Sequence, residues 1–280
     1  MPYKAEISRT SPSCFLFLID QSGSMSDPFS AATGKAKADA LADGINKLLQ
    51  NLVIKCTKSE GVRDYYEIGV IGYGGNKGVG PAFLGALEKQ DLVPLSKVAN
   101  SPARVEDRVK KIDDGAGGLI DQTIKFPVWF DSIADNGTPM CEGLRYAQRV
   151  LQDWVGRHQP CYPPTVINIS DGEAGDGDPE PIAQAITQMS TSDGNVLLFN
   201  CHVSSHAAAP IQYPDREDAL PDQFAKALFR MSSILPSGLL DAARSEGFAV
   251  SDRSRGFVFN AELVDLIRFL DIGTRPSNLR

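Results

Sequence analysis

Apolar residues follow two alternating spacings along this chain. Short runs that are almost wholly apolar predict strands buried on both faces, and apolar residues three and four positions apart predict helices with one buried face. Because the two patterns alternate, the sequence predicts an α/β fold with a doubly wound, mostly parallel central sheet and helices on both of its faces. The predicted strands span 14–19, 66–73, 166–170, 196–201 and 257–259, and the predicted helices span 38–52, 140–154, 179–189, 224–231 and 263–270.

Residues 74–135 interrupt this alternation. The segment is longer than one hairpin and one helix require, and an irregular insertion of that length is commonly functional. Val105, Val109 and Ile112 have a spacing that allows a short helix within it. We therefore expect a family-specific insertion that recognises a partner, and we expect removal of residues 96–118 to alter which partner binds.

Composition and charge add weak limits. The 280 residues carry a net charge of −7 without a basic run, so nucleic acid is a poor candidate partner. No charged-then-apolar signal segment opens the chain, and no apolar run approaches the roughly 20 residues that cross a bilayer. The five cysteines are widely separated and form no C-x-x-C pair. We expect a cytoplasmic protein without membrane contact, with one domain over residues 1–280 and a flexible tail at 271–280.

The clearest candidate chemistry follows the first predicted strand. Asp20, Ser22 and Ser24 occupy positions i, i+2 and i+4 of the polar stretch that begins where the apolar run ends. A carboxylate and two hydroxyls at this spacing in a loop can point into one small cavity. They are hard oxygen donors with little charge, a set that suits Mg²⁺ and leaves the ion in need of another ligand.

Two further segments supply oxygen donors in similar positions. Thr138 precedes Pro139 at the start of a predicted helix, where Thr138 is expected to be the N-cap and Pro139 the first helical residue. Asp171 directly follows the predicted strand at 166–170. Ligands of open parallel sheets bind at the carboxyl ends of the strands, so Asp20 and Asp171 are expected at one edge of the sheet.

These three segments together resemble the von Willebrand factor A (vWA) domain family with its metal-ion-dependent adhesion site. Its motifs are a D-x-S-x-S sequence, a lone Thr and an Asp in a strand-end D-G context, and all three occur here in that order. The resemblance implies that Ser22 and Ser24 coordinate a metal through their hydroxyls. Asp20 and Asp171 would act directly or through water, and Thr138 would be a switchable ligand. The sixth position would be left to water or to a carboxylate of a partner.

Each segment also has a simpler interpretation by itself. Asp20 to Ser24 can form a turn in which Asp and Ser side chains bind backbone amides. Thr138 before a proline is ordinary helix capping, and Asp171 can cap the turn after its strand. A metal-free structural domain is the corresponding interpretation of the whole.

Other groups give weaker signals. Glu173, Asp176 and Asp178 form an acidic loop that could hold a second cation, although their spacing differs from a twelve-residue calcium loop and favours a solvated loop. Cys201, His202 and His206 could suggest a zinc site, but no fourth ligand lies at a usual spacing. The glycine-rich run after the second strand lacks the GK[ST] of a phosphate loop.

The favoured function is a non-enzymatic binding module. It would dock an Asp or Glu of a protein partner on a bound Mg²⁺, with Mn²⁺ or Ca²⁺ as substitutes. The chain resembles stand-alone intracellular bacterial vWA proteins, and that resemblance implies a link with protein kinases, phosphatases or AAA+ ATPases in stress systems. A metal-dependent phosphohydrolase is the alternative. It is disfavoured because Ser22 stands where aspartate phosphatases place a second Asp, and because no lysine has an obvious position for binding a phosphoryl group.

Overall fold

The fold was taken from a computed structural model. The predicted tail at 271–280 and all of the predicted helix at 263–270 except Arg268 lie outside the described residues. His206 and residues 114–117 of the insertion also lie outside the described residues. The structure describes residues 2–28, 34–76, 78–113, 118–203, 209–260 and 268.

The central sheet of the described chain confirms the predicted fold class. Five parallel strands form its middle in the order β4–β1–β9–β12–β14, and shorter antiparallel strands pair at its edges. The parallel strands are β1 (Ser13–Gln21), β4 (Tyr66–Gly74), β9 (Thr165–Ser170), β12 (Leu197–His202) and β14 (Phe257–Phe259), and the edge strands are β5 (Gly80–Pro81), β6 (Val93–Pro94) and β13 (Ile211–Gln212).

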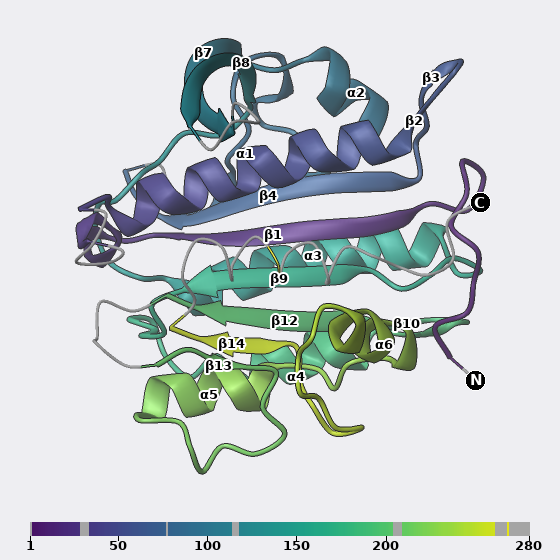
Figure 1. The fold of residues 1–280 in the computed structure, drawn as a ribbon. Helices are drawn as coiled ribbons and strands as arrows, with labels where there is room; N and C mark the ends of the chain where they lie inside the picture. The colour runs from purple at the N-terminus through teal and green to yellow at the C-terminus, as the bar shows by residue number, and fades with distance from the viewer. Residues whose placement is uncertain are drawn as a thin grey trace.

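Helices cover both faces of this sheet (Figure 1). Alternate residues of β1 explain why its sequence is apolar throughout: Phe15 and Phe17 pack in the core beneath α1, α2 and α6, whereas Leu16 and Leu18 pack beneath α3, α4 and α5. The sequence patterns did not predict α2 or α6. The helices are α1 (Lys37–Cys56), α2 (Leu95–Asn100), α3 (Met140–Arg157), α4 (Glu180–Gln188), α5 (Gln223–Met231) and α6 (Ser237–Ser245).

Several short elements complete the described chain. Two 3₁₀ turns and two small hairpins lie between the longer elements. They are η1 (Gly23–Ser26), η2 (Gly85–Leu87), β2 (Thr57–Lys58) with β3 (Gly61–Val62), and β10 (Ser190–Thr191) with β11 (Gly194–Asn195). Within the residues that the structure describes, no helix is both long and apolar enough to span a bilayer.

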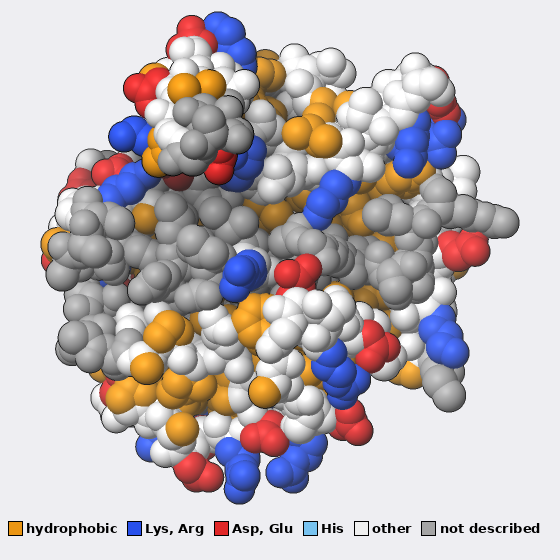
Figure 2. Space-filling model, viewed as in Figure 1, with side chains coloured by type: hydrophobic (Ala, Val, Ile, Leu, Met, Phe, Trp, Pro, Cys, Tyr) orange, Lys and Arg blue, Asp and Glu red, His pale blue; other side chains and the backbone are white. Residues whose placement is uncertain are grey.

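The short helix predicted in the insertion is wrong, because its residues form a long antiparallel hairpin of β7 (Arg104–Asp113) and β8 (Leu119–Val128). Val105 and Val109 are 55% and 66% exposed, so their spacing does not reflect a buried helical face. On this hairpin, at the upper left of Figure 2, hydrophobic side chains lie among charged ones.

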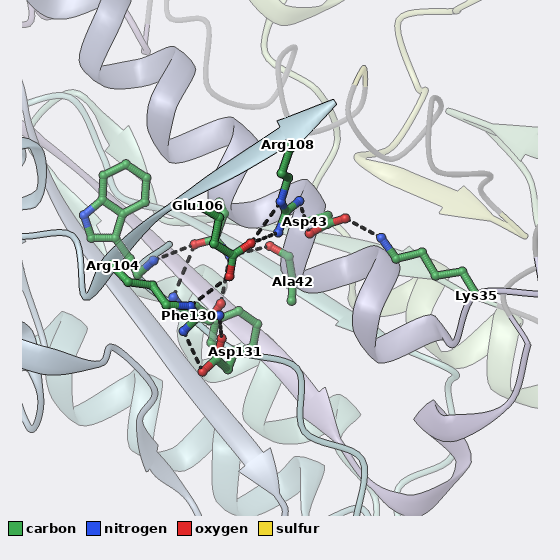
Figure 3. A network of polar contacts seen from close by, with 10 residues as sticks. Lys35, Ala42, Asp43, Arg104, Glu106, Arg108, Phe130 and Asp131 are labelled. Atoms are coloured by element: carbon green, nitrogen blue, oxygen red, sulfur yellow. Dashed lines mark hydrogen bonds and ion pairs between the residues drawn. The ribbon is translucent and has the colours of Figure 1, made fainter. Parts of the chain in front are cut away.

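The hairpin is attached to α1 mainly through charged side chains on its inner face (Figure 3). Arg108 donates to Asp43 of α1 at 2.7 Å, and its guanidinium lies 3.7 Å from the centre of the Phe126 ring. At the base of the hairpin, the amide nitrogen of Trp129 donates to Oδ1 of the buried Asn46 at 2.8 Å. The base is therefore anchored in the core, whereas the arms are held at the surface.

Candidate functional site

The first candidate loop leaves the centre of the sheet at its carboxyl edge, on the left of Figure 1. Asp20 lies in β1, only 1% exposed, and both of its carboxylate oxygens accept hydrogen bonds. Oδ1 accepts from the amide of Ser22 at 2.9 Å, and Oδ2 accepts from the hydroxyl of Ser170 at 2.7 Å. Asp20 thus fixes the start of its own loop and ties it to the end of β9.

Burial raises the pKa of Asp20 to about 6, and the nearby charge of Asp171 acts in the same direction. Hydrogen bonds from Ser22 and Ser170 oppose this shift without cancelling it. A carboxylate so disfavoured in its charged form would be stabilised by a nearby cation.

Ser22 and Ser24 bring their hydroxyls together. The two Oγ atoms lie 3.1 Å apart at the start of the 3₁₀ turn η1. Octahedral Mg²⁺ binds oxygen at about 2.0–2.1 Å, which places adjacent ligands about 3 Å apart. The separation of the two serine hydroxyls therefore fits two neighbouring ligands of one magnesium ion.

The loop that contains Thr138 is joined to the first loop by backbone hydrogen bonds. The amide of Gly23 donates to the carbonyl of Asn136 at 2.8 Å, and the amide of Asp135 donates to the carbonyl of Gln21 at 2.8 Å. The third loop joins through the amide of Gly175, which donates to the carbonyl of Thr138 at 2.8 Å. Main-chain hydrogen bonds thus join each of the three loops to another.

Thr138 does not have the capping role predicted for it. Helix α3 begins at Met140, Pro139 is its N-cap residue, and no side chain of the N-cap binds the helix amides. The carboxylate of Asp176 from the third loop accepts from the amides of Cys141 at 3.0 Å and Glu142 at 2.9 Å. Because Asp176 caps the helix, the hydroxyl of Thr138 is not used for capping and is available to a ligand.

This contact also explains the acidic loop, since Asp176 caps α3 and Asp178 accepts from the amide of Glu180 at the start of α4. A second cation site there has no support: among the described residues, no three His, Cys, Asp or Glu side chains group as metal ligands. The predicted site depends on only two carboxylates, with hydroxyls as its other donors.

Asp171 directly follows β9, as predicted, and its side chain is 14% exposed. Together with Ser24 and Thr138 it lines a cavity of about 330 Å³. Asp20 and Ser22 are 1% and 2% exposed and are joined to this cavity's residues through Asp20–Ser22 and Ser22–Ser24 hydrogen bonds. The structure thus brings all five predicted site residues together. The hard oxygen donors they supply are of the kind that Mg²⁺ prefers.

The predicted site left out several residues that line this cavity, among them Lys37, His202, Asp27 and Asp222. Lys37 is the first residue of α1, and its Nζ lies 3.5 Å from Oδ2 of Asp171. A lysine in the first turn is on the unfavourable end of the helix dipole, which was the available sequence signal. Burial lowers the pKa of His202 to about 4, so its imidazole is neutral near pH 7.

Comparisons with known proteins give similarity of fold only. No family model matches the chain, and no curated protein matches it. Solved structures that are similar to it include the PilB minor pilin from Streptococcus sanguinis, at 13% identity and a TM-score of 0.47 over 94% of this chain and 60% of that one.

Two others carry vWF or VWA in their names. The vWF domain of the type V pili tip protein Mfa5 from Porphyromonas gingivalis has 16% identity and a TM-score of 0.31, covering 59% of this chain and 39% of that one. The ArnB paralog VWA2 from Sulfolobus acidocaldarius has 13% identity and a TM-score of 0.32, covering 69% and 35%.

The chain thus spans less than two thirds of the length of each of these structures. At such identities, and with TM-scores below 0.5, the comparisons do not bear on function. The doubly wound sheet with helices on both faces, and its three loops meeting at the carboxyl edge, give this chain a vWA-like α/β fold.

Proposed function

We propose that this chain is a metal-dependent protein-interaction module that binds an acidic side chain of a partner. The observation that supports it most is the convergence of Ser24, Thr138 and Asp171 on one cavity, with the hydroxyl of Ser22 3.1 Å from that of Ser24. A bound Mg²⁺ would offer a coordination position to a carboxylate of the partner. The partner would be a protein that presents Asp or Glu.

The residues have separate roles in this proposal. Ser22, Ser24 and Thr138 would hold the ion through hydroxyls, and Asp171 would balance its charge directly or through water. Asp20 would orient the loop, because both of its oxygens already accept hydrogen bonds from Ser22 and Ser170.

A second cavity of about 330 Å³ also has Thr138 in its lining, together with several glycines. A Cβ at Gly137 would meet no atom within 4 Å, so packing does not explain this glycine. Short residues there leave space for the main chain of a partner to pass close to Thr138. Gly137→Leu is expected to weaken partner binding and to leave Mg²⁺ affinity unchanged.

The proposal can be tested with a displayed library of random peptides, captured by the purified chain in Mg²⁺ and eluted with EDTA. We expect enrichment of peptides that contain Asp or Glu, and we expect the Ser22→Ala/Ser24→Ala protein to lose them. Ser26→Ala is the matched control, because Ser26 lies in the same turn and its hydroxyl donates to the carbonyl of Gly23. Enrichment that persists in EDTA would contradict the proposal.

The phosphohydrolase alternative gains one observation from the structure. The sequence-based objection that no lysine is placed to bind a phosphoryl group is wrong, because Lys37 lines the cavity. Two features oppose the alternative. Asp20 is 1% exposed with both oxygens bonded, which makes it a poor nucleophile, and His202 with a pKa of about 4 is a weak base at pH 7. Mg²⁺-dependent hydrolysis of p-nitrophenyl phosphate, lost in Lys37→Met, would favour the enzyme.

The cytoplasmic location stays a prediction from cysteine usage and composition, and the link to kinase, phosphatase or AAA+ ATPase stress systems stays a prediction of the resemblance. Identification of the peptide motif would direct the search for the natural partner. A motif found in such enzymes would favour the predicted system.

A further inference from the structure

Lys37 places a buried ammonium beside the candidate metal ligands. Its side chain is 4% exposed, and Nζ lies 3.5 Å from Oδ2 of Asp171 and 3.8 Å from Oδ2 of Asp27. Nζ also donates to the carbonyl of Ser24 at 3.4 Å. The backbone amide of Lys37 donates to the carbonyl of Asp27 at 2.9 Å, which fixes the start of α1 at this point.

This position is unfavourable for a lysine unless negative charge is close. The N-terminus of α1 carries partial positive charge, and burial removes water from the ammonium. Asp27 is 56% exposed and mostly solvated, so the more buried Asp171 is the stronger counter-charge. Lys37 and Asp171 therefore depend on each other.

We propose that Lys37 is a built-in counter-ion that competes with a divalent metal for Asp171 and so limits the metal affinity of the site. The inference rests on the proposed function, because it takes Asp171 and the neighbouring hydroxyls as metal ligands. A divalent ion bound at these residues must displace the ammonium from Asp171 or remain close to it. In a partly buried site, repulsion between two cations a few ångströms apart is weakly screened.

The same charge favours an acidic ligand. Lys37 is the one lysine or arginine among the described residues that line the cavity, whose acidic lining residues are Asp27, Asp171, Glu173 and Asp222. A carboxylate of a partner that reaches an ion beside Asp171 also comes close to the ammonium of Lys37, and opposite charges attract at this range. Lys37 is thus expected to weaken metal binding and to strengthen binding of the acidic partner, two effects of opposite sign from one side chain.

Calorimetric titration of the full chain with Mg²⁺ tests this directly. Lys37→Met keeps the length of the side chain and removes its charge, and we expect it to bind Mg²⁺ at least tenfold more tightly than the wild type. Lys37→Arg keeps the charge and is expected to stay within threefold. The matched control is Lys35→Met, because Lys35 pairs with Asp43 outside the cavity and should also stay within threefold.

Melting in EDTA shows whether each variant is folded, and Lys37→Gln is the second neutral variant if Lys37→Met unfolds. A second readout uses a selected acidic peptide at saturating Mg²⁺, to which the neutral variants should bind at least fivefold more weakly than wild type.

The outcomes separate the inference from the proposed function. If wild type and a folded neutral variant bind Mg²⁺ with the same affinity, the role of Lys37 is overturned and the proposed function stands. A neutral variant that binds while wild type does not supports the inference, with Lys37 keeping the site metal-free. Absence of binding in both proteins at millimolar Mg²⁺ overturns both.

Discussion

The loops at the carboxyl edge of the sheet and the β7–β8 hairpin are positioned by different kinds of contact. Main-chain hydrogen bonds join the loops, for example from Gly23 to Asn136 at 2.8 Å, and the Asp20 carboxylate beneath them is almost fully buried. Among the described residues, one ion pair, Arg108–Asp43, joins the hairpin arms to α1, and its side chains are 33% and 29% exposed.

This difference separates a rigid site from an adjustable surface. Buried, directional contacts fix the donors of a metal site before the ion binds, which small ions such as Mg²⁺ require. Partly exposed ion pairs contribute only about 0–1 kcal/mol each and weaken with salt. Changes of the oxygen donors in the loops should therefore alter metal binding, whereas changes in the hairpin should alter recognition alone.

Ser22→Ala/Ser24→Ala is expected to have the largest effect. The double substitution removes two hydroxyl ligands, and we expect Mg²⁺ affinity to fall more than 100-fold because losing even an outer partner costs about 10–100-fold. The melting temperature in EDTA should change little, since the amide of Ser22, which the substitution keeps, still donates to the carboxylate of Asp20. Titration calorimetry and melting would measure the two quantities. Collapse of the fold in EDTA would instead show that these serines are structural.

Asp20→Asn should give opposite effects on metal binding and on metal-free stability. We expect Mg²⁺ affinity to fall about 10–100-fold, as for other outer-shell changes. Stability in EDTA should rise, because a buried carboxylate without a paired cation is costly and the amide keeps its shape. Urea unfolding of both proteins in EDTA at pH 7 measures this difference in metal-free stability. A large loss of stability would mean that the hydrogen bonds of Asp20 outweigh the burial of its charge.

Replacing residues 107–125 with Asn-Gly should test the hairpin without disturbing its base. The change joins Glu106 to Phe126, which are paired in the present register, through residues that favour a two-residue turn. We expect Mg²⁺ affinity to stay within twofold and the selected peptides to change. Removal of 96–118, as the sequence suggested, would instead cut α2, whose Leu95 and Val98 are fully buried. A tenfold loss of Mg²⁺ affinity after the 107–125 replacement would contradict the separation of the metal site from the hairpin as a recognition surface.

The smallest expected effect is a pH dependence of the hairpin attachment. Burial alone would raise the pKa of Asp43, but hydrogen bonds and charges of Lys35 and Arg108 outweigh it and lower the pKa. The stabilisation is therefore present above the ordinary value of 3.8 and lost as the pH falls through the lower folded value. Wild type should exceed Asp43→Asn in urea stability by less than about 1 kcal/mol at pH 6, with the difference shrinking as the pH falls below the ordinary value of 3.8. A difference in urea stability that does not change with pH would show that it does not come from the ionised carboxylate of Asp43.

The same contrast explains what the sequence could predict. Strands such as β1 are buried on both faces, so their apolar runs are unmistakable, and Asp20 and Asp171 follow from where those runs end. In the hairpin only Phe126 and Val128, near its base, are buried among the described residues, and the exposed Val105 and Val109 at helical spacing carried no information on packing.

Contacts between distant segments were beyond the sequence. That Asp176 caps α3 in place of Thr138, and that Lys37 reaches Asp171, both depend on loops that meet only in the folded chain. Local capping preferences favoured Thr138 because they cannot include a carboxylate from a segment more than thirty residues away.

The central claim is that the three loops form one metal site. A crystal of the chain grown in millimolar Mn²⁺ and measured at the manganese absorption edge tests it most directly. We predict one anomalous peak among the hydroxyls of Ser22, Ser24 and Thr138, at distances suited to direct coordination. An absent peak, or one located only beside Glu173 or Asp178, would contradict the site.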